Sequence, residues 1–159
     1  MIGYRTIAAA AFFSAGVVFA MPAEAQVLSA SNPTAIAAFL RSEGASTEVK
    51  TDTDGDPLIE ASLGKNQKFS VYFYGCTNHV NCTSVQYYAG YTDSKMDAAK
   101  LNDWNRGKRY GRAYIDKVGD PVVEMDVDME GGMPRSLFED NFSIWQSLMN
   151  KFSDFVYAK

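Results

Sequence analysis

The chain has 159 residues, of which 47% are hydrophobic and 21% are charged, and its formal net charge at pH 7 is −4. This mildly acidic balance excludes nucleic acid as an expected partner, because phosphate recognition needs clustered Lys and Arg. It also argues against binding to an anionic membrane surface.

The first 25 residues predict an export signal. Arg5 precedes an apolar run over residues 7–20, and the sequence AEA at 23–25 offers a cleavage site. A transmembrane anchor is the alternative, but a spanning helix needs about 20 apolar residues. We therefore expect cleavage before Gln26 and a periplasmic location without membrane contact. The remaining 134 residues, 26–159, are expected to form a single domain.

Next along the chain, a helix and an antiparallel meander are predicted. Asn32 and Pro33 suit the cap and first position of a helix that ends at Gly44. Extended segments then alternate with short turns, one of which is Asp-Gly-Asp. The predicted strands are residues 46–53, 57–63, 69–74 and 83–88.

Two cysteines lie at the end of the last of these hairpins. Cys76 and Cys82 would face each other across it, and export places them where paired thiols oxidise, so a disulfide is predicted. The alternative is zinc held by both thiols and His79, but zinc needs a fourth ligand and the chain has one His. His79 is then expected to be an exposed loop residue, with no metal bound.

The following residues predict a second helix and a further hairpin. Ser94 is the expected N-cap of the helix, which ends at Gly107. Strands over 110–117 and 122–130 then enclose a turn at Gly119-Asp120. Because like faces must align across a hairpin, we expect Arg112 to face Asp126 or Asp128, which requires an odd loop length or a bulge.

The clearest pattern is in the last helix, predicted from Pro134 to about Tyr157. One arc of about 160° is apolar and must be covered, and the sheet is the only surface large enough. Asn141 interrupts this arc, and we expect its amide to bond a nearby backbone group; a polar contact in a groove or dimer seam is the alternative. The apolar arc holds Leu137, Phe138, Phe142, Ile144, Trp145, Leu148, Met149, Phe152, Phe155 and Val156.

Two acidic stretches could bind a cation or act in acid–base chemistry. Glu124, Asp126, Asp128 and Glu130 alternate along one strand face. Carboxylates on a flat strand diverge, so we interpret them as a solvated outer face neutralised in part by Arg112, Lys108 and Arg109. The aspartates over 52–56 begin like a calcium loop, but Pro57 and Leu63 replace the required Gly and Glu, and a turn explains them better. Calcium binding stays an alternative there.

Several stretches together resemble the YbjN family, bacterial sensory transduction regulators. They are LNDWN at 101–105, the run from Arg109 into the next strand, GDPVVEMD at 119–126, FEDNF at 138–142, and the cysteine pair with the residues beside it. The resemblance covers about residues 34–155, and the cysteines and leader are similar to those of exported members. It implies an α+β fold similar to type III secretion chaperones, with a twisted antiparallel sheet of about six strands covered by helices.

The resemblance also implies homodimers that bind protein segments, and it implies no enzyme chemistry and no cofactor. Trp104, Asn105, Arg109 and Asn141 match its motif positions and are the candidate binding residues. Taken from the residues alone, they are a core anchor, a helix C-cap, a surface charge and a buried amide. We expect a periplasmic, non-catalytic module that binds a protein or peptide. A cation- or small-ligand-binding protein, or a carboxylate-based hydrolase, are the alternatives.

Overall fold

The computed structural model describes residues 26–158, so the predicted leader lies outside the described residues. Six antiparallel strands form one sheet in the order β2-β3-β4-β5-β7-β6, and three helices accompany it. The predicted α+β class is therefore confirmed, and the sheet is not closed into a barrel. Its strands are β2 (Ala45–Thr51), β3 (Pro57–Leu63), β4 (Gln67–Tyr74), β5 (Ser84–Gly90), β6 (Arg112–Ile115) and β7 (Pro121–Asp128).

The helices begin where their capping residues place them. Asn32 caps α1 (Pro33–Ser42), because its side-chain oxygen accepts from the Ala35 amide at 3.0 Å. The predicted start of the second helix at Ser94 is wrong. Asp97 accepts from the Ala99 amide at 2.8 Å and caps α2 (Ala98–Gly107), whereas the Ser94 hydroxyl donates to the backbone oxygen of Val156.

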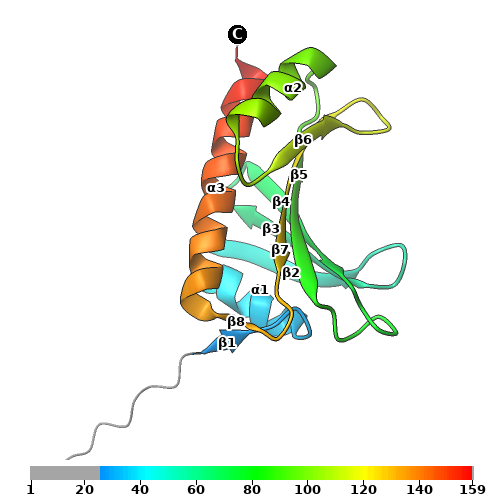
Figure 1. The fold of residues 1–159 in the computed structure, drawn as a ribbon, viewed down its shortest axis with the longest axis vertical. Helices are drawn as coiled ribbons and strands as arrows, with labels where there is room; N and C mark the ends of the chain where they lie inside the picture. Colours follow the sequence, from blue (N-terminus) through cyan, green and yellow to red (C-terminus); the bar gives the residue numbers. More distant parts are fainter. Residues whose placement is uncertain (1–25, 159) are drawn as a thin grey trace, which may run out of the picture.

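The last helix, α3 (Arg135–Tyr157), lies along the length of the sheet, with α1 near one end and α2 near the other (Figure 1). A small two-stranded sheet, which the sequence did not predict, precedes α3. It pairs β1 (Val27–Leu28) with β8 (Met133–Pro134) and so fixes the N-terminal end of the described chain beside the start of α3.

Aromatic side chains join α3 to the sheet. Trp145 stacks on Tyr87 of β5, with ring centroids 5.4 Å apart, and meets Phe69 of β4 edge-on. Phe138 contacts Phe39 of α1 at 5.0 Å, edge to face. These rings are buried, as the apolar arc predicted, so the core lies between α3 and one face of the sheet.

The β2–β3 and β6–β7 hairpins use the same three-residue loop. In the β2–β3 hairpin, the Asp52 carboxylate accepts from the amides of Asp54 and Asp56, and Gly55 has a φ of +94°. The β6–β7 hairpin repeats this geometry from Asp116 to Asp120, with Gly119 at the same φ. The interpretation of residues 52–56 as a turn is confirmed, and so is the odd loop length near Gly119.

The predicted disulfide between Cys76 and Cys82 is present. His79 lies in the loop that it closes and is exposed, as expected, with Nδ1 2.8 Å from a carboxylate oxygen of Asp56. The imidazole also lies against Gly55 of the neighbouring hairpin. The disulfide loop and the β2–β3 turn therefore support each other.

Tyr87 gives a prediction about the core. Its hydroxyl is buried without a hydrogen-bond partner in the described part of the chain, and this burial raises its pKa well above the usual value near 10. We expect Tyr87→Phe to raise the free energy of unfolding by about 1 kcal/mol, because an unsatisfied polar group is removed. Chemical denaturation measured by circular dichroism checks this.

The pH dependence has a definite sign. Because burial raises the pKa of the Tyr87 phenol, the unfolded chain ionises first above about pH 10, so stability falls as the pH rises toward the folded-state pKa. Tyr87→Phe should therefore weaken alkaline destabilisation. Tyr91→Phe is the matched control, because the Tyr91 hydroxyl donates to the backbone oxygen of Met149 at 2.9 Å and its loss should cost stability. A loss of stability in Tyr87→Phe would contradict the assignment.

Candidate functional site

One face of the sheet carries no helix. The aromatic core lies on the opposite face, where α1 and α3 pack (Figure 1). Strand alternation therefore directs a second set of side chains to the open face, and register aligns them in rows across neighbouring strands. From β2 to β6 these residues include Glu48, Glu60, Ser70, Tyr72, Tyr88, Gln86, Glu124 and Arg112.

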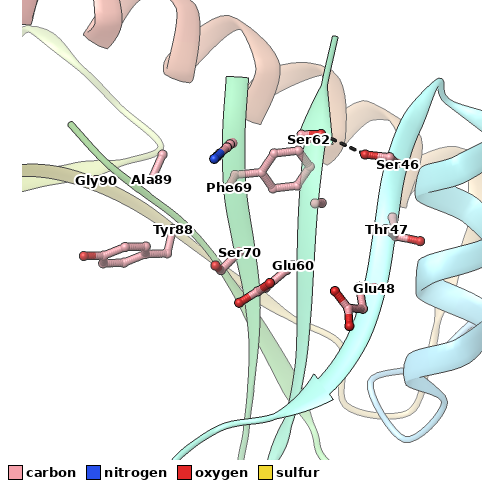
Figure 2. A pocket seen from close by; sticks show the side chains of 12 residues that line it. Ser46, Thr47, Glu48, Glu60, Ser62, Phe69, Ser70, Tyr88, Ala89 and Gly90 are labelled. Atoms are coloured by element: carbon pink, nitrogen blue, oxygen red, sulfur yellow. Dashed lines mark hydrogen bonds between the residues drawn. The ribbon is translucent and has the colours of Figure 1, made fainter. Parts of the chain in front are cut away.

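A first hollow of about 500 Å³ lies over β2 to β5 on this face (Figure 2). Ser46 and Ser62 hydrogen-bond across β2 and β3 at 2.8 Å. Lys50 donates to Glu60 at 2.6 Å and lies 3.2 Å from Glu48, and these bonds raise its pKa. Lys50 lies beside the lining, which includes Lys68 and both glutamates, so the hollow has both charge signs, and its serines are short side chains.

Two tyrosines separate this hollow from a second one. Tyr72 of β4 and Tyr88 of β5 meet edge to face with centroids 5.7 Å apart and an interplanar angle of 84°. Both side chains are half-buried, and burial raises the pKa of Tyr88, so its hydroxyl is neutral at physiological pH. Half-exposed tyrosines offer flat apolar area together with a hydrogen-bonding group, as at protein interfaces.

The second hollow, of about 570 Å³, lies over β4, β5, β7 and β6. Glu124 is one of its lining residues and is only 5% exposed. One carboxylate oxygen accepts from the Arg112 Nε at 2.8 Å and the other accepts from the Tyr114 hydroxyl. Burial and this second bond raise the pKa of Tyr114. Beside them, the Gln86 amide donates to Asp126 at 2.7 Å.

These contacts correct two predictions. Arg112 pairs with Glu124 in the register, not with Asp126 or Asp128, because the β6–β7 loop is centred on Val118. The acidic stripe is also not uniformly solvated, since Glu124 is buried between Arg112 and the neighbouring strands while Asp126, Asp128 and Glu130 are exposed. Lys108 does not neutralise the stripe; its ammonium lies 4.4 Å from the Trp104 ring centroid.

Two of the four candidate binding residues, Trp104 and Asn105, lie in α2 and join it to neighbouring elements. Trp104 is 7% exposed and packs on Phe152 and Phe155 of α3, with centroids 5.0 and 5.1 Å away, so it is a core anchor. Asn105 is not the helix C-cap, which is Lys108. Its amide instead bonds both backbone groups of Ala113, at 2.9 and 2.8 Å, and so ties α2 to β6.

The other two candidates lie apart from these. Arg109 is exposed and its guanidinium lies 5.5 Å from the ring centroid of Tyr110. Asn141 donates to the backbone oxygen of Leu137 at 2.8 Å, which confirms the local bond expected for it. Asn141 lies 11 residues before Phe152, the residue of α3 that Trp104 contacts. The two positions are therefore about 16 Å apart along the helix axis. A binding role for the four residues stays a prediction.

The open-face residues Ser70, Tyr72, Gln86 and Tyr88 were not among the predicted site residues. Their signal was present in the alternation of β4 and β5, which places polar and aromatic side chains on one face and apolar ones on the other. The sequence does not show which face the helices leave open. The alternation could therefore identify which side chains share a face of the sheet, but not that this face is left uncovered.

Within residues 26–158, no group of three or more His, Cys, Asp or Glu side chains is placed to hold a metal ion. In the same range, no helix combines the length and the apolar content that crossing a membrane requires.

The fold and the open face define a small α+β module whose six-stranded antiparallel sheet is covered by helices on one face only. Residues 32–158 match the family model YbjN, described as "Putative bacterial sensory transduction regulator". The chain belongs to the YbjN family. Comparisons with curated proteins and with solved structures give no match.

Proposed function

We propose that the chain is a periplasmic, non-catalytic module that binds a protein or peptide partner through the open face of its sheet. The observation that carries this proposal is the uncovered face itself, with two polar hollows on either side of the Tyr72–Tyr88 pair. Tyrosine is enriched in protein interfaces and among the residues that contribute most of the binding energy. The family description, a regulator of sensory transduction, is consistent with a binding role.

The buried carboxylate also favours binding over catalysis. Both oxygens of Glu124 accept hydrogen bonds, from Arg112 and Tyr114, so this group orders the surface. An ordered surface loses little conformational entropy when a partner binds. The periplasmic location in the proposal is supported by the predicted leader and by the disulfide, which persists in an oxidising compartment.

The test is retention of a partner by the immobilised chain from a bacterial periplasmic extract. We expect a retained protein that is lost when Tyr72 and Tyr88 are both replaced by alanine, because these rings supply the apolar contact area. Tyr157→Ala is the matched control, since Tyr157 is exposed at the end of α3. No retained protein, or equal retention by the double variant, would overturn the proposal.

The same proposal includes self-association. The family resemblance suggests a homodimer, and size-exclusion chromatography with light scattering measures the mass directly. We expect twice the monomer mass at micromolar concentration. A strictly monomeric chain would remove the homodimer from the proposal without affecting partner retention.

A further inference from the structure

The outer edge of β7 is only half covered. β5 pairs with β7 over residues 122–128, but β6 pairs only with residues 121–124. Strand pairing on the β6 side stops at Arg112, and the chain that precedes it comes down from α2 beside α3 (Figure 1). Residues 125–128 of β7 therefore have one neighbouring strand in the described chain and not two.

The register shows which backbone groups this leaves free. The Tyr91 amide donates to Pro121 and the Met129 amide donates to Thr83, so odd-numbered residues of β7 bond to β5. Even-numbered residues then direct their N–H and C=O groups to the other side. Asp126 and Asp128 are the two such residues beyond β6, and within residues 26–158 their backbone groups make no hydrogen bond on that side.

On the open face, this edge is acidic. The side chains of Asp126 and Asp128 are both exposed, and they stand two residues apart on one strand, about 6.6 Å from each other. The second hollow beside them contains three carboxylates and one guanidinium, that of Arg112. A strand placed along the edge would therefore meet negative charge on this face.

On the helix face, the same edge is apolar. Leu137 is 48% exposed and Ile144 is half-buried, and helical spacing aligns both with Leu148. Leu148 packs at the start of β6, since a Cβ on Gly111 would come within 2.2 Å of it and within 2.9 Å of the Glu124 backbone oxygen. This stripe of α3 thus faces the β6–β7 side of the sheet.

We propose that an extended peptide segment with alternating basic and apolar residues adds to the sheet along residues 125–128 of β7, in line with β6. Its backbone hydrogen-bonds to Asp126 and Asp128, as in other cases of strand addition to a free sheet edge. Its basic side chains face the two aspartates and its apolar side chains cover Leu137 and Ile144. This rests on the proposed function and specifies the partner's chemistry.

The probe is a capped eight-residue peptide of alternating Val and Lys, added to the isotope-labelled mature chain. We expect the amides of Asp126 and Asp128 to become protected from hydrogen exchange by at least about tenfold, because they gain hydrogen-bond partners. The amides of Met125 and Val127 already bond to β5 and serve as internal controls. Two further peptides carry N-methylated backbone amides, one on its Val residues and the other on its Lys residues. Because only alternate amides of a strand point toward β7, at most one of these two peptides should bind.

Charge reversal supplies the second arm. Asp126→Lys with Asp128→Lys should weaken binding at least about tenfold. Glu139→Lys with Asp154→Lys changes the net charge equally on the outer face of α3 and should leave binding unchanged. Equal binding by both N-methylated peptides, or equal loss in both charge variants, would overturn strand addition.

Absence of binding would also overturn it, and would leave the two aspartates as charges that protect a free edge from self-association. The two proposals fail separately. If periplasmic extract yields a partner whose retention is unaffected by the aspartate variants, strand addition at β7 is wrong and the open-face proposal stands.

Discussion

Trp145→Ala is expected to lower the free energy of unfolding by about 3 to 5 kcal/mol. The indole is fully buried, stacks on Tyr87 of β5 and meets Phe69 of β4, so alanine would leave a cavity at the centre of the contact between α3 and the sheet. The indole N–H has no partner in the described chain, and losing it offsets part of the cost, which favours the lower end of this range. Urea unfolding followed by circular dichroism measures the change.

Leu137→Ala on the same helix is the control. Leu137 is 48% exposed, so its truncation should cost less than about 1 kcal/mol. A loss in Trp145→Ala no larger than this would mean that α3 is not packed on the sheet as described. A large loss in Leu137→Ala would instead show that its exposed side is covered in solution, which a dimer or bound segment would produce.

The comparison of these two residues shows what helical periodicity can predict. Hydrophobic spacing identified α3 and its apolar arc, and most of that arc is buried. Leu137 lies near the edge of the arc and is 48% exposed, and β6, which begins at Arg112, pairs with no residue of β7 beyond Glu124. Periodicity within one element cannot report the length of a neighbouring one.

Strand order shows the same limit. Short turns between successive strands fixed the meander from β2 to β5, because such turns force neighbours in sequence to pair. α2 then separates β5 from the last hairpin, and either strand of that hairpin could have paired with β5. β7 does so, and its first five residues are all buried. The run of apolar residues at 121–123 was a signal for a central strand.

The candidate site could be predicted least. The alternation of side chains predicted that Arg112 faces the acidic strand. Which carboxylate it pairs with depends on the centre of the β6–β7 loop, and the centre at Val118 places Arg112 opposite Glu124. The burial of Glu124 depends in turn on side chains from two other strands. The open face is a property of the assembled layers, since a row of alternating side chains looks the same whether a helix or solvent covers it.

Removal of the disulfide is expected to cost about 2 to 3 kcal/mol. Cys76 and Cys82 close a loop of seven residues, and a bridge of this length restricts the unfolded chain by about that amount. Cys82 is also 4% exposed and part of the core, so the bridge holds the β4–β5 hairpin against it. The double variant Cys76→Ala/Cys82→Ala should unfold at lower urea concentration, and reduction of the unaltered chain should give a similar shift.

Zinc provides the decisive control for this bridge. His79 lies between the two cysteines in the chain, and its imidazole contacts Asp56, 2.8 Å away, in the bridged structure. If the disulfide is the working state, zinc added to the reduced chain should not restore stability, because within residues 26–158 no three of the His, Cys, Asp and Glu side chains are placed to hold a metal ion. Full recovery with zinc, abolished by His79→Ala, would contradict the disulfide and with it one of the arguments for a periplasmic location. Recovery upon reoxidation alone, unchanged in His79→Ala, is the expected result.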